Sequence, residues 1–534
     1  MWLRTATKKL GRVVVGMSGG VDSSVSAYLL KLQGYDVVAV HMVNWDAREE
    51  ESEQHKPKGS ILECFEKDYQ DVQNVCKELN IPCHQTNFVQ EYWQDVFQPT
   101  LDGYAAGITP NPDVLCNRHI KFDLFLSYAM KHFQADYIAT GHYARLQFAT
   151  ANDDDDESSL KPLQQRPQLL VGKDTLKDQS YFLSNVTSKQ LEKVLFPIGH
   201  LNKTQVRNIA RISNLPSLQQ TALRKESYGM CFVGKRNFQE FIHSYVEPVS
   251  GVFIDVDTNQ ILQHSPPKGS GSSESSEGSE DNTNHPSDQH HRAALPNSRS
   301  KSRKKKSRKK KKKKENILLN KNNNIQHEGF ASYTVGQGAR IGGMNEKWYV
   351  TSKDLTTGNV YVCKGKDHPK LWTRSCTSSS FSWTAGHPPQ QLTNGSTNGL
   401  TNIAQEQQHP TVLLPTNEVV STVTKEDDAF LTRKGAVLNC LCRVRYRQTM
   451  VPCTVRLLTN ENTTAVVDSA VAQSGVVEPV VCVVFDEPVE AVAPGQIVAL
   501  YDGVICLGGG TIDNNQNNQN KSNNKSKDEH KTNT

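Results

Sequence analysis

Apolar residues in the first third of the chain alternate between short continuous runs and helical spacings. Val13–Val15 form a run typical of a buried strand, and residues 22–33 carry apolar side chains at positions 25, 28, 29 and 32 before Gly34. A glycine directly after such a pattern is typical of a helix end. Because residues 37–42 form a second apolar run, the segment predicts two parallel strands joined by a right-handed helical crossover.

The pattern continues to about residue 214 and then changes. The sequence predicts further helices at about 66–79, 91–102, 117–131 and 203–214, and a strand at 135–140. Short apolar runs separated by Gly and Asn turns follow at about 252–262 and 329–363. Between about 436 and 512, alternating and continuous apolar runs, among them TAVVDSAV, predict a small β-barrel or sandwich.

Four stretches are too biased in composition to build a core. They are an acidic insertion at 151–168, a Ser-, Gly-, Asn-, His- and Lys-rich stretch at about 265–325, a Ser/Thr/Gln/Asn-rich insertion from about 385 to between 410 and 430, and an Asn/Lys tail at 513–534. Such compositions predict disordered or flexible surface segments.

The positive net charge comes from one cluster. The 534-residue chain has a formal net charge of +5 and a mean hydropathy of −0.58, and 13 of its lysines and arginines lie within residues 299–314. Removing these 13 charges from +5 leaves −8. We expect this run to be an inert, solvated insert, with nucleic-acid binding or mimicry of an import signal as the alternatives.

The 12 cysteines are scattered and include no CxxC pair. Since we also recognise no signal peptide, neither a disulfide scaffold nor a zinc module is expected, and no metal site is assigned. Cys440 and Cys442 would share one face of a strand, which favours packing. No stretch resembles a membrane span, and the first twelve residues resemble a transit peptide only weakly.

A glycine-rich loop joins the first predicted strand to the first predicted helix. Residues 13–24 read VVVGMSGGVDSS, in which Gly16, Gly19 and Gly20 permit close backbone approach while the helix start directs amide groups at an anion. No lysine precedes Ser23, so this is not a Walker A loop, and the glycine spacing differs from that of the dinucleotide fingerprint. The loop therefore predicts a phosphate site of another kind.

Cys116 lies in the stretch NPDVLCNRHIKFD, at the mouth of the helix expected over 117–131. A thiol at a helix N-terminus ionises more readily, which favours a reactive role. Asp113, three residues earlier, would oppose a thiolate unless it caps the helix or moves protons. Because most intracellular cysteines are packing residues, these residues alone favour a buried filler.

The segment Ser18–Ser23 resembles the PP-loop of ATP pyrophosphatases, which cleave ATP between its α and β phosphates. The chain further resembles the tRNA-specific 2-thiouridylases, most closely the mitochondrial members, over essentially residues 11–512 apart from the biased inserts. The resemblance is carried, in order, by MVNWD (42–46), TPNPDVLCNRHIKF (109–122), ATGHYAR (139–145), KDQSYFL (177–183), GMCFVGKRNF (229–238), IGGMNEKWYV (341–350), RVRYRQ (443–448) and PGQIVALYDGVICLGGG (494–510).

The resemblance implies an ATP-dependent sulfurtransferase acting on tRNA. ATP would adenylate the C2 oxygen of a wobble uridine that is turned out of its stack, and persulfide sulfur would displace AMP. Cys231 would carry the persulfide, Cys116 would be its partner nucleophile, and Asp113 would do acid/base work at the base. A disulfide would then remain for reductants to reset. From spacing alone, a strand-core cysteine is the favoured explanation of Cys231.

The resemblance also implies which residues bind ATP and tRNA. The ATP site, with Mg²⁺ at Asp22, would be formed by Gly16, Met17, Ser18, Gly19, Gly20, Val21, Asp22, Ser23, Met42 and Gly141. The tRNA would contact Asn111, Pro112, Asp113, His142, Lys177, Asp178, Gln179, Arg445, Tyr446 and Gln496. Without the resemblance, ordinary roles are favoured for three positions: a sheet-edge histidine at His142, a solvated pair at Lys177–Asp178 and a barrel core residue at Tyr446.

The implied fold class is an α/β PP-loop domain with a parallel sheet, followed by a small, mostly β central domain and a C-terminal β-barrel. We place these at residues 1–230, 231–372 and 373–512. The implied partners are a tRNA with a wobble uridine and a persulfide donor protein, with neither DNA nor a membrane, and the implied compartment is the mitochondrion. Family members usually have an arginine after the Gly–Gln of YTVGQ, where this chain has Gly338, so an RNA contact there would depend on Arg340.

Two other classes of function stay open at this point. A PP-loop ligase that adenylates a carboxylate or a small metabolite would lack paired reactive cysteines and the C-terminal barrel. A nucleic-acid-binding protein that depends on the lysine-rich run would lose its function when residues 299–314 are deleted.

Overall fold

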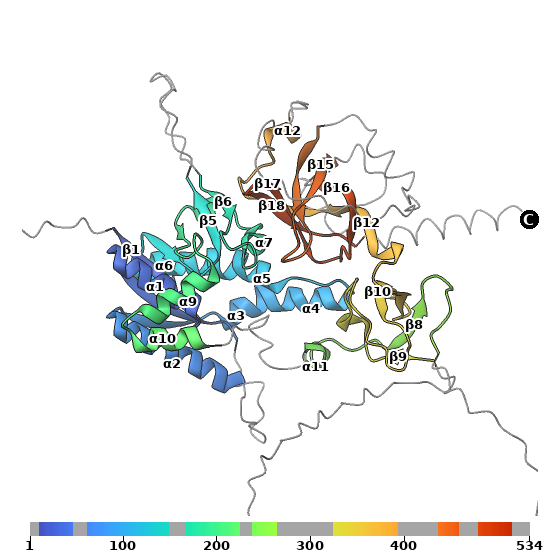
Figure 1. Ribbon diagram of the computed structural model, residues 1–534, viewed down its shortest axis with the longest axis horizontal. Coiled ribbons are helices and arrows are strands. Elements are labelled where there is room, and N and C mark those ends of the chain that lie inside the picture. Colours follow the sequence, from blue (N-terminus) through green and yellow to red (C-terminus); the bar gives the residue numbers. More distant parts are fainter. Residues whose placement is uncertain are drawn as a thin grey trace, which may run out of the picture.

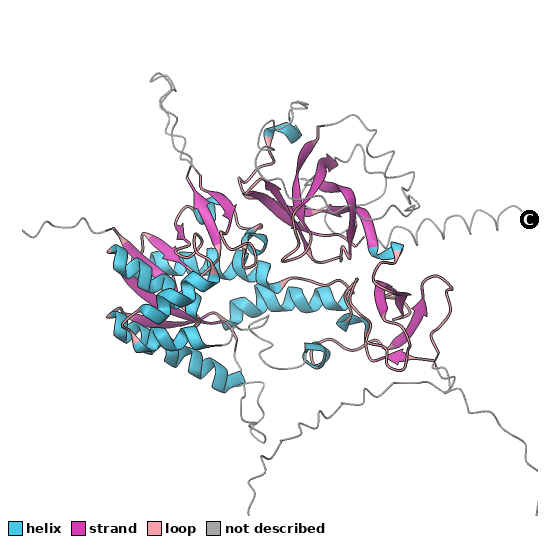
Figure 2. Cartoon of the chain, viewed as in Figure 1, coloured by secondary structure: helices cyan, strands magenta, loops and turns pink. Residues whose placement is uncertain are grey.

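The computed structural model describes residues 10–45, 61–148, 166–224, 238–263, 324–393, 436–458 and 479–514. These residues form three β-sheets, and most of the helices surround the first sheet (Figures 1 and 2). Most of the acidic insertion, the lysine-rich run, most of the Asn/Lys tail and the strand expected at TAVVDSAV lie outside the described residues. No helix within the described ranges is long and apolar enough to cross a membrane.

The first sheet is the parallel sheet that the sequence predicts. Its strand order is β3 (Cys83–Asn87), β2 (Asp36–Val43), β1 (Arg12–Gly16), β4 (Tyr137–Ala139) and β7 (Val194–Leu195). Every strand pair in it is parallel. The crossover from β1 to β2 is α1 (Val21–Gln33), which ends at Gly34 in the left-handed conformation, as expected.

Helices cover both faces of this sheet, which explains why its strands are apolar throughout. Val13 and Val15 point to the face covered by α1 and α2 (Ile61–Leu79), whereas Val14 points to the other face. Next to α1 pack α9 (Lys203–Ile212) and α10 (Pro216–Leu223). The opposite face is covered by α3 (Val89–Tyr92), η1 (Trp93–Phe97), α4 (Gln98–Ala105), α5 (Pro112–Leu115), η2 (Cys116–Leu124) and α6 (Phe125–Phe133).

The central part of the chain forms a small sheet of its own. Its order is β10 (Trp348–Lys353), β11 (Val360–Lys364), β8 (Gly251–Asp255) and β9 (Gln326–His327), with α11 (Phe238–His243) and η3 (Phe330–Ser332) beside it. Figure 1 shows α4 extending from the first sheet toward this one.

The C-terminal part is an antiparallel sheet with its own apolar core. Its strand order is β12 (Trp372–Ser378), β16 (Val480–Glu490), β15 (Val451–Leu458), β14 (Leu438–Arg443), β17 (Ile497–Asp502) and β18 (Ile505–Thr511), and β13 (Ser380–Trp383) pairs with β18. The short helices η4 (Pro369–Leu371) and α12 (Gln390–Thr393) adjoin it in sequence. A parallel α/β part followed by β-rich parts confirms the predicted fold class.

One hairpin from the N-terminal third joins the C-terminal sheet. The strands β5 (Ala144–Gln147) and β6 (Gln168–Val171) pair with each other, and Leu170 of β6 pairs with Ile505 of β18. After this hairpin the chain forms α7 (Ser180–Leu183) and α8 (Ser188–Leu191). The segment between β6 and α7 therefore lies where the α/β part meets the barrel.

Candidate functional site

The glycine-rich loop turns the chain from β1 into α1. Gly19 has a φ of +77°, in the left-handed region that favours glycine, and Gly20 is the N-cap of α1 with no side-chain cap among the described residues. The Ser23 hydroxyl accepts the Ser18 amide at 3.2 Å and lies 3.3 Å from the Ser18 hydroxyl. The start of this 13-residue helix thus offers amide donors and the positive end of its dipole, which suits an anion.

Asp22, in the first turn of α1, is held by groups from two other elements. Lys203, at the start of α9, donates from Nζ to both carboxylate oxygens at 2.8 and 2.7 Å. The Tyr143 hydroxyl donates to the same carboxylate at 2.6 Å. These contacts place the Lys203 ammonium and the Tyr143 hydroxyl beside the first turn of α1, directly after the glycine-rich loop.

Arg224 binds the loop from the side of α2. Its guanidinium donates to the Gly19 carbonyl at 2.7 Å and pairs with Asp68 and, at 2.9 Å, with Asp71. A Cβ at position 19 would lie 2.7 Å from the Asp68 carbonyl oxygen, so the packing requires glycine as strongly as the φ does. The loop is therefore clamped between α1, α2 and the residue that follows α10.

Gly16, Met42 and Gly141, all residues of the expected ATP site, lie at the same end of the sheet. Gly141 follows β4 and packs on the first turn of α1, where a Cβ would lie 2.7 Å from the Ser23 amide nitrogen. A Cβ on Gly16 would meet the Met42 methyl carbon at 3.2 Å. Met17 and Val21 are only 1% and 7% exposed, so their side chains belong to the core beneath the loop.

Cys116 lies inside a helix, and the expectation that it stands at a helix N-terminus is wrong. The helix begins one turn earlier, at Pro112, because proline suits the first helical position, where the missing amide donor costs nothing. A helix-dipole effect on the Cys116 thiol therefore loses its basis, since that effect fades beyond the first turn. The residue is 6% exposed and begins the π-helical stretch η2, a rare geometry that is frequent at functional sites.

Asp113 lies one turn before Cys116, at the i, i+3 spacing that places two side chains on one helix face. Asp113 is half-buried, and desolvation of its carboxyl group raises its pKa, while the charge of Lys121 opposes that rise. A carboxyl group with a raised pKa exchanges protons closer to neutral pH, which suits acid/base chemistry.

The segment before this helix is held by the other two parts of the chain. The Thr109 amide donates to the Pro494 carbonyl at 2.8 Å, and Gln496 Nε2 donates to the Thr109 carbonyl at 2.8 Å. The Thr109 hydroxyl also lies 3.2 Å from the Thr334 hydroxyl. Asn111 follows two residues later, so Gln496, an expected tRNA contact, already supports the segment that leads to Asp113 and Cys116.

Residues 177–183 lie between the helix of Cys116 and strand β14. Asn117 donates from Nδ2 to the Phe182 carbonyl at 3.0 Å, and the Phe182 ring lies 4.5 Å from that of Tyr446. Tyr446 is half-buried and packs against an apolar cluster that includes both Cys116 and barrel residues such as Ile497, so its contact with tRNA stays a prediction. Its neighbour Arg445 is half-buried.

The expected contacts within KDQSYFL differ in exposure. Lys177 and Gln179 are half-buried, and Gln179 Oε1 accepts the Tyr143 amide at 3.0 Å. Asp178 is 1% exposed, so the alternative of a solvated Lys177–Asp178 pair is wrong.

His142 is a buried histidine with a partner. Its Nδ1 lies 2.7 Å from the Thr140 hydroxyl and its ring lies 5.6 Å from the Phe122 ring of η2. Burial lowers the pKa of the imidazole well below its usual value, and the charge of Lys121 adds to that. These contacts match the structural alternative for His142, and its contact with tRNA stays a prediction.

Residues 141–143 bring the two halves of the site together. Gly141 touches the Ser23 end of the loop, His142 lies against the helix that carries Cys116, and Tyr143 binds Asp22. Cys231 lies outside the described residues, so its position relative to Cys116 stays a prediction. No group of three or more metal-ligating side chains occurs in the described part of the chain.

Sequence reasoning missed Tyr143, Lys203 and Arg224. Tyr143 belongs to the stretch ATGHYAR, and no local pattern marked its hydroxyl as a partner of Asp22. Lys203 follows the N-cap Asn202, which marks a helix start but not what that start faces. The ion pairs of Arg224 span more than 150 residues, a distance that local patterning does not encode.

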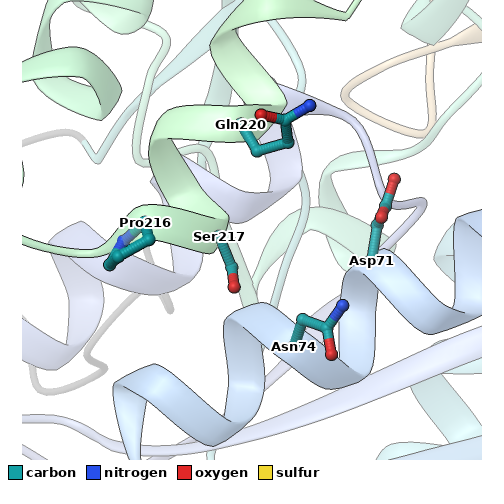
Figure 3. Close-up of a pocket in the computed structure, with 5 residues that line it drawn as sticks. All are labelled: Asp71, Asn74, Pro216, Ser217 and Gln220. Carbon is teal, nitrogen blue, oxygen red and sulfur yellow. The ribbon is translucent and has the colours of Figure 1, made fainter.

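A cavity of about 220 Å³ lies between α2 and α10, beside the Arg224 clamp (Figure 3). Its lining consists of Asp71, Asn74, Pro216, Ser217 and Gln220. The Ser217 amide and hydroxyl both donate to Glu78, which therefore caps α10. None of the residues predicted to bind ATP or tRNA lines this cavity, and we do not assign it to the site.

Family models match three stretches of the chain. A model described as "tRNA methyl transferase HUP domain" matches residues 11–235, one described as "tRNA methyl transferase PRC-barrel domain" matches 308–364, and one described as "Aminomethyltransferase beta-barrel domain" matches 470–512.

Relatives match along nearly the whole length of the chain. A tRNA-specific 2-thiouridylase MnmA from Alkaliphilus oremlandii is 34% identical over 507 residues, covering 94% of this chain and 97% of the relative. The Bacillus subtilis protein of that name is 35% identical over 504 residues, covering 94% and 95%. The mitochondrial tRNA-specific 2-thiouridylase 1 of Homo sapiens is 31% identical over 512 residues, covering 94% and 90%, so these identities do not single out the mitochondrial branch. The chain belongs to the tRNA-specific 2-thiouridylase family.

Proposed function

We propose that this protein is an ATP-dependent tRNA 2-thiouridylase, which replaces the C2 oxygen of a wobble uridine by sulfur. The observation that carries the proposal is the placement of residues 141–143, which touch the glycine-rich loop at one end and the helix of Asp113 and Cys116 at the other. An activated phosphate and a thiol can meet one base only if their two elements are adjacent, and this segment makes them so.

The loop and its surroundings suit a nucleoside triphosphate. Gly16, Met17, Ser18, Gly19, Gly20, Val21, Asp22, Ser23, Met42 and Gly141 form the proposed ATP site. Amide groups at the start of α1 and the Ser18 and Ser23 hydroxyls face the phosphates, and Lys203 adds a cation that is now held on Asp22. Asp22 is the proposed partner of Mg²⁺, which would take the place of that ammonium.

The proposed chemistry has three displacement steps. The uridine C2 oxygen attacks the α phosphorus of ATP, and the P–O bond to pyrophosphate breaks, so that the base carries AMP on that oxygen. The terminal sulfur of a persulfide on Cys231 then attacks C2, the C2–O bond breaks, and AMP leaves with the oxygen. The Cys116 thiolate then attacks Sγ of Cys231, and the S–S bond to the transferred sulfur breaks. That sulfur stays on C2 as the thiocarbonyl, and a Cys116–Cys231 disulfide is left. Asp113 moves protons at the base.

The tRNA contacts form three proposed groups. Asn111, Pro112 and Asp113 meet the target base, and Cys116 follows one turn later. His142, Lys177 and Gln179 lie on the α/β side, and Arg445, Tyr446 and Gln496 come from the barrel. The sequence also placed Asp178 among these contacts, but its side chain is enclosed, so it supports the segment from within. The Phe182–Tyr446 contact and the hydrogen bond from Gln496 to Thr109 support a shared surface, because they join the two sides next to the helix of Cys116.

The remaining assignments extend the proposal. A persulfide donor protein supplies the sulfur, the compartment is the mitochondrion, and the three domains span about residues 1–230, 231–372 and 373–512. Three separate sheets support this division, with the β5–β6 hairpin as the link to the barrel.

Incubation with an unmodified tRNA transcript tests the proposal. The purified protein receives ATP, Mg²⁺ and a persulfide donor, and the digested tRNA is analysed for 2-thiouridine by mass spectrometry beside Cys231→Ser and Cys116→Ser. We expect 2-thiouridine and AMP with the unchanged protein and no 2-thiouridine with Cys231→Ser. AMP formation without a thiolated base in any sample would instead favour a PP-loop ligase acting on a small molecule.

A further inference from the structure

Asp178 carries a carboxylate that is fully enclosed at the seam between the α/β part and the barrel. Its side chain is 0% exposed. Oδ1 accepts the Gly172 amide at 2.8 Å and the Ser180 amide at 3.1 Å, and Oδ2 accepts the Ser180 hydroxyl at 2.8 Å. The carboxylate thus links the end of β6 to the start of α7 by hydrogen bonds to Gly172 and Ser180.

The charge partner of Asp178 comes from the barrel. Arg443, the last residue of β14, donates from Nη1 to Oδ2 and is itself buried, with a side chain 9% exposed. The guanidinium also lies 5.3 Å from the centre of the Tyr501 ring, whose hydroxyl is 3.2 Å from that of Ser180. Strands β14 and β17 of the barrel therefore both contact residues 178–180.

The same segment also holds the residues that follow Arg443. The Tyr181 hydroxyl lies 3.4 Å from the Val444 carbonyl and 3.1 Å from the Ile497 carbonyl, and Phe182 packs on Tyr446. Residues 443–448, which we call the 443–448 loop, are thus fastened to the α/β part at Arg443, Val444 and Tyr446.

We propose that Asp178 is a positioning residue: through Arg443 it fixes the 443–448 loop, and with it Arg445 and Tyr446, in the geometry that receives tRNA, without touching RNA itself. The assignment of the ligand as tRNA rests on the proposed function. Two arguments exclude a direct contact. No surface of the carboxylate is open to a phosphate or base, and a carboxylate repels the phosphate backbone that dominates RNA affinity.

Because the charge pair is buried, this role can be tested by asking whether the effects of the two single substitutions add up in the double variant. Removing one partner leaves an unpaired charge in a desolvated site, whereas removing both replaces the pair by neutral groups. Asp178→Asn keeps the size of the side chain and an acceptor for the two backbone amides. Arg443→Met removes the other charge while keeping an unbranched side chain, and Arg443→Lys keeps the charge as a milder change.

The experiment compares Asp178→Asn, Arg443→Met, Arg443→Lys and the double variant Asp178→Asn/Arg443→Met with Lys177→Met. The full chain is used throughout, and binding of a nonhydrolysable ATP analogue checks that the α/β part is intact. Hydrogen exchange of peptides covering the 443–448 loop and the glycine-rich loop is measured without RNA. Affinity for a tRNA transcript is then measured over a range of salt concentrations, together with KM for tRNA and kcat.

In Asp178→Asn and Arg443→Met we expect faster exchange in the 443–448 loop, unchanged exchange in the glycine-rich loop, and a KM for tRNA raised about tenfold with kcat within about twofold. The double variant should bind tRNA more tightly than the product of the two single effects predicts. The salt slope, which is the slope of the logarithm of the tRNA binding constant against the logarithm of the salt concentration, should stay unchanged in Asp178→Asn. Its magnitude should fall by about one in Lys177→Met, which removes a proposed phosphate contact.

Two results would overturn the inference. One is unchanged exchange of the 443–448 loop in Asp178→Asn and Arg443→Met, and the other is strict additivity combined with a reduced salt slope in Asp178→Asn. If the unchanged protein binds no tRNA, the proposed function fails, and the exchange data alone decide whether Asp178 fixes the loop. If Arg443→Met does not fold, Asp178→Asn and Arg443→Lys carry the test.

Discussion

Gly141→Ala should weaken nucleotide binding although it adds a single methyl group. The new Cβ would lie 2.7 Å from the Ser23 amide nitrogen, 2.8 Å from the Asp22 carbonyl carbon and 3.1 Å from the Asp22 Cβ. All three atoms belong to the first turn of α1, which begins at the proposed phosphate site. A methyl group therefore cannot be accepted by moving the far end of a flexible side chain.

The size of the effect follows from the overlap. Ordinary contact begins at 3.4 Å, so the end of β4 and the start of α1 must separate by about 0.7 Å. Forcing an extra carbon into a packed interior costs about 1–3 kcal/mol. If about 2 kcal/mol of this is lost from nucleotide binding, the dissociation constant for ATP rises about 30-fold.

Calorimetric titration with a nonhydrolysable ATP analogue measures the effect. The matched control is Gly338→Ala, because no described heavy atom lies within 4 Å of the Cβ position there. The control should bind the analogue like the unchanged protein. If Gly141→Ala also binds with unchanged affinity while it folds normally, the contact between residue 141 and α1 does not set the nucleotide site, and the reasoning fails.

Three further predictions concern single side chains. Lys203→Met should raise the dissociation constant for the ATP analogue about 10- to 150-fold, since a charge-assisted hydrogen bond contributes about 1.5–3 kcal/mol. The control is Lys31→Met in the last turn of α1, and equal affinities of the two variants would refute the assignment. Asp113→Asn should lower kcat for 2-thiouridine formation at least about 100-fold and remove the acidic limb of its pH profile, while analogue binding stays unchanged; a retained acidic limb would assign that limb to another group. Burial lowers the pKa of His327 from 6.5 to about 4, so below pH 6.5 the unfolded chain binds a proton that the folded chain does not, and stability is lost as the pH falls through this window. His327 should contribute about 2 kcal/mol to the decrease in the free energy of unfolding between pH 7 and pH 5, measured by urea unfolding. This decrease should therefore be about 2 kcal/mol smaller in His327→Phe, and an equal decrease in the variant would contradict the prediction.

The parts of the fold that the sequence predicts well are local. The run at Val13–Val15, the helix ending at Gly34 and the run at 37–42 each lie within one or two elements, and the structure confirms them as β1, α1 and β2. The glycine-rich loop was recognisable for the same reason, because its backbone geometry depends on Gly19 and Gly20 themselves.

Contacts between distant residues account for what the sequence did not predict. The pairing of Leu170 with Ile505 places β6 in the barrel sheet, and the strand pattern of β6 is the same whichever partner it has. The Asp178–Arg443 pair joins positions 265 residues apart, so KDQSYFL gave no sign that its aspartate would be buried.

The misplaced helix start near Cys116 has a different cause. Pro112 precedes the helix expected over 117–131, but proline is favoured at the first helical position, and the helix begins there. The apolar spacing over 117–131 marks the buried face of the helix, and this face begins later than the helix does. Sequence alone therefore located the helix but placed Cys116 at its end.

Oxygen transfer tests the central claim most directly. A tRNA with ¹⁸O at C2 of the wobble uridine is incubated with the protein, ATP, Mg²⁺ and a persulfide donor, and the AMP released is analysed by mass spectrometry. Adenylation of the base followed by sulfur attack at C2 predicts one ¹⁸O atom in AMP for each 2-thiouridine formed, with none in pyrophosphate. If 2-thiouridine forms while AMP stays unlabelled, the base is not activated through its own oxygen, and the proposed mechanism is contradicted.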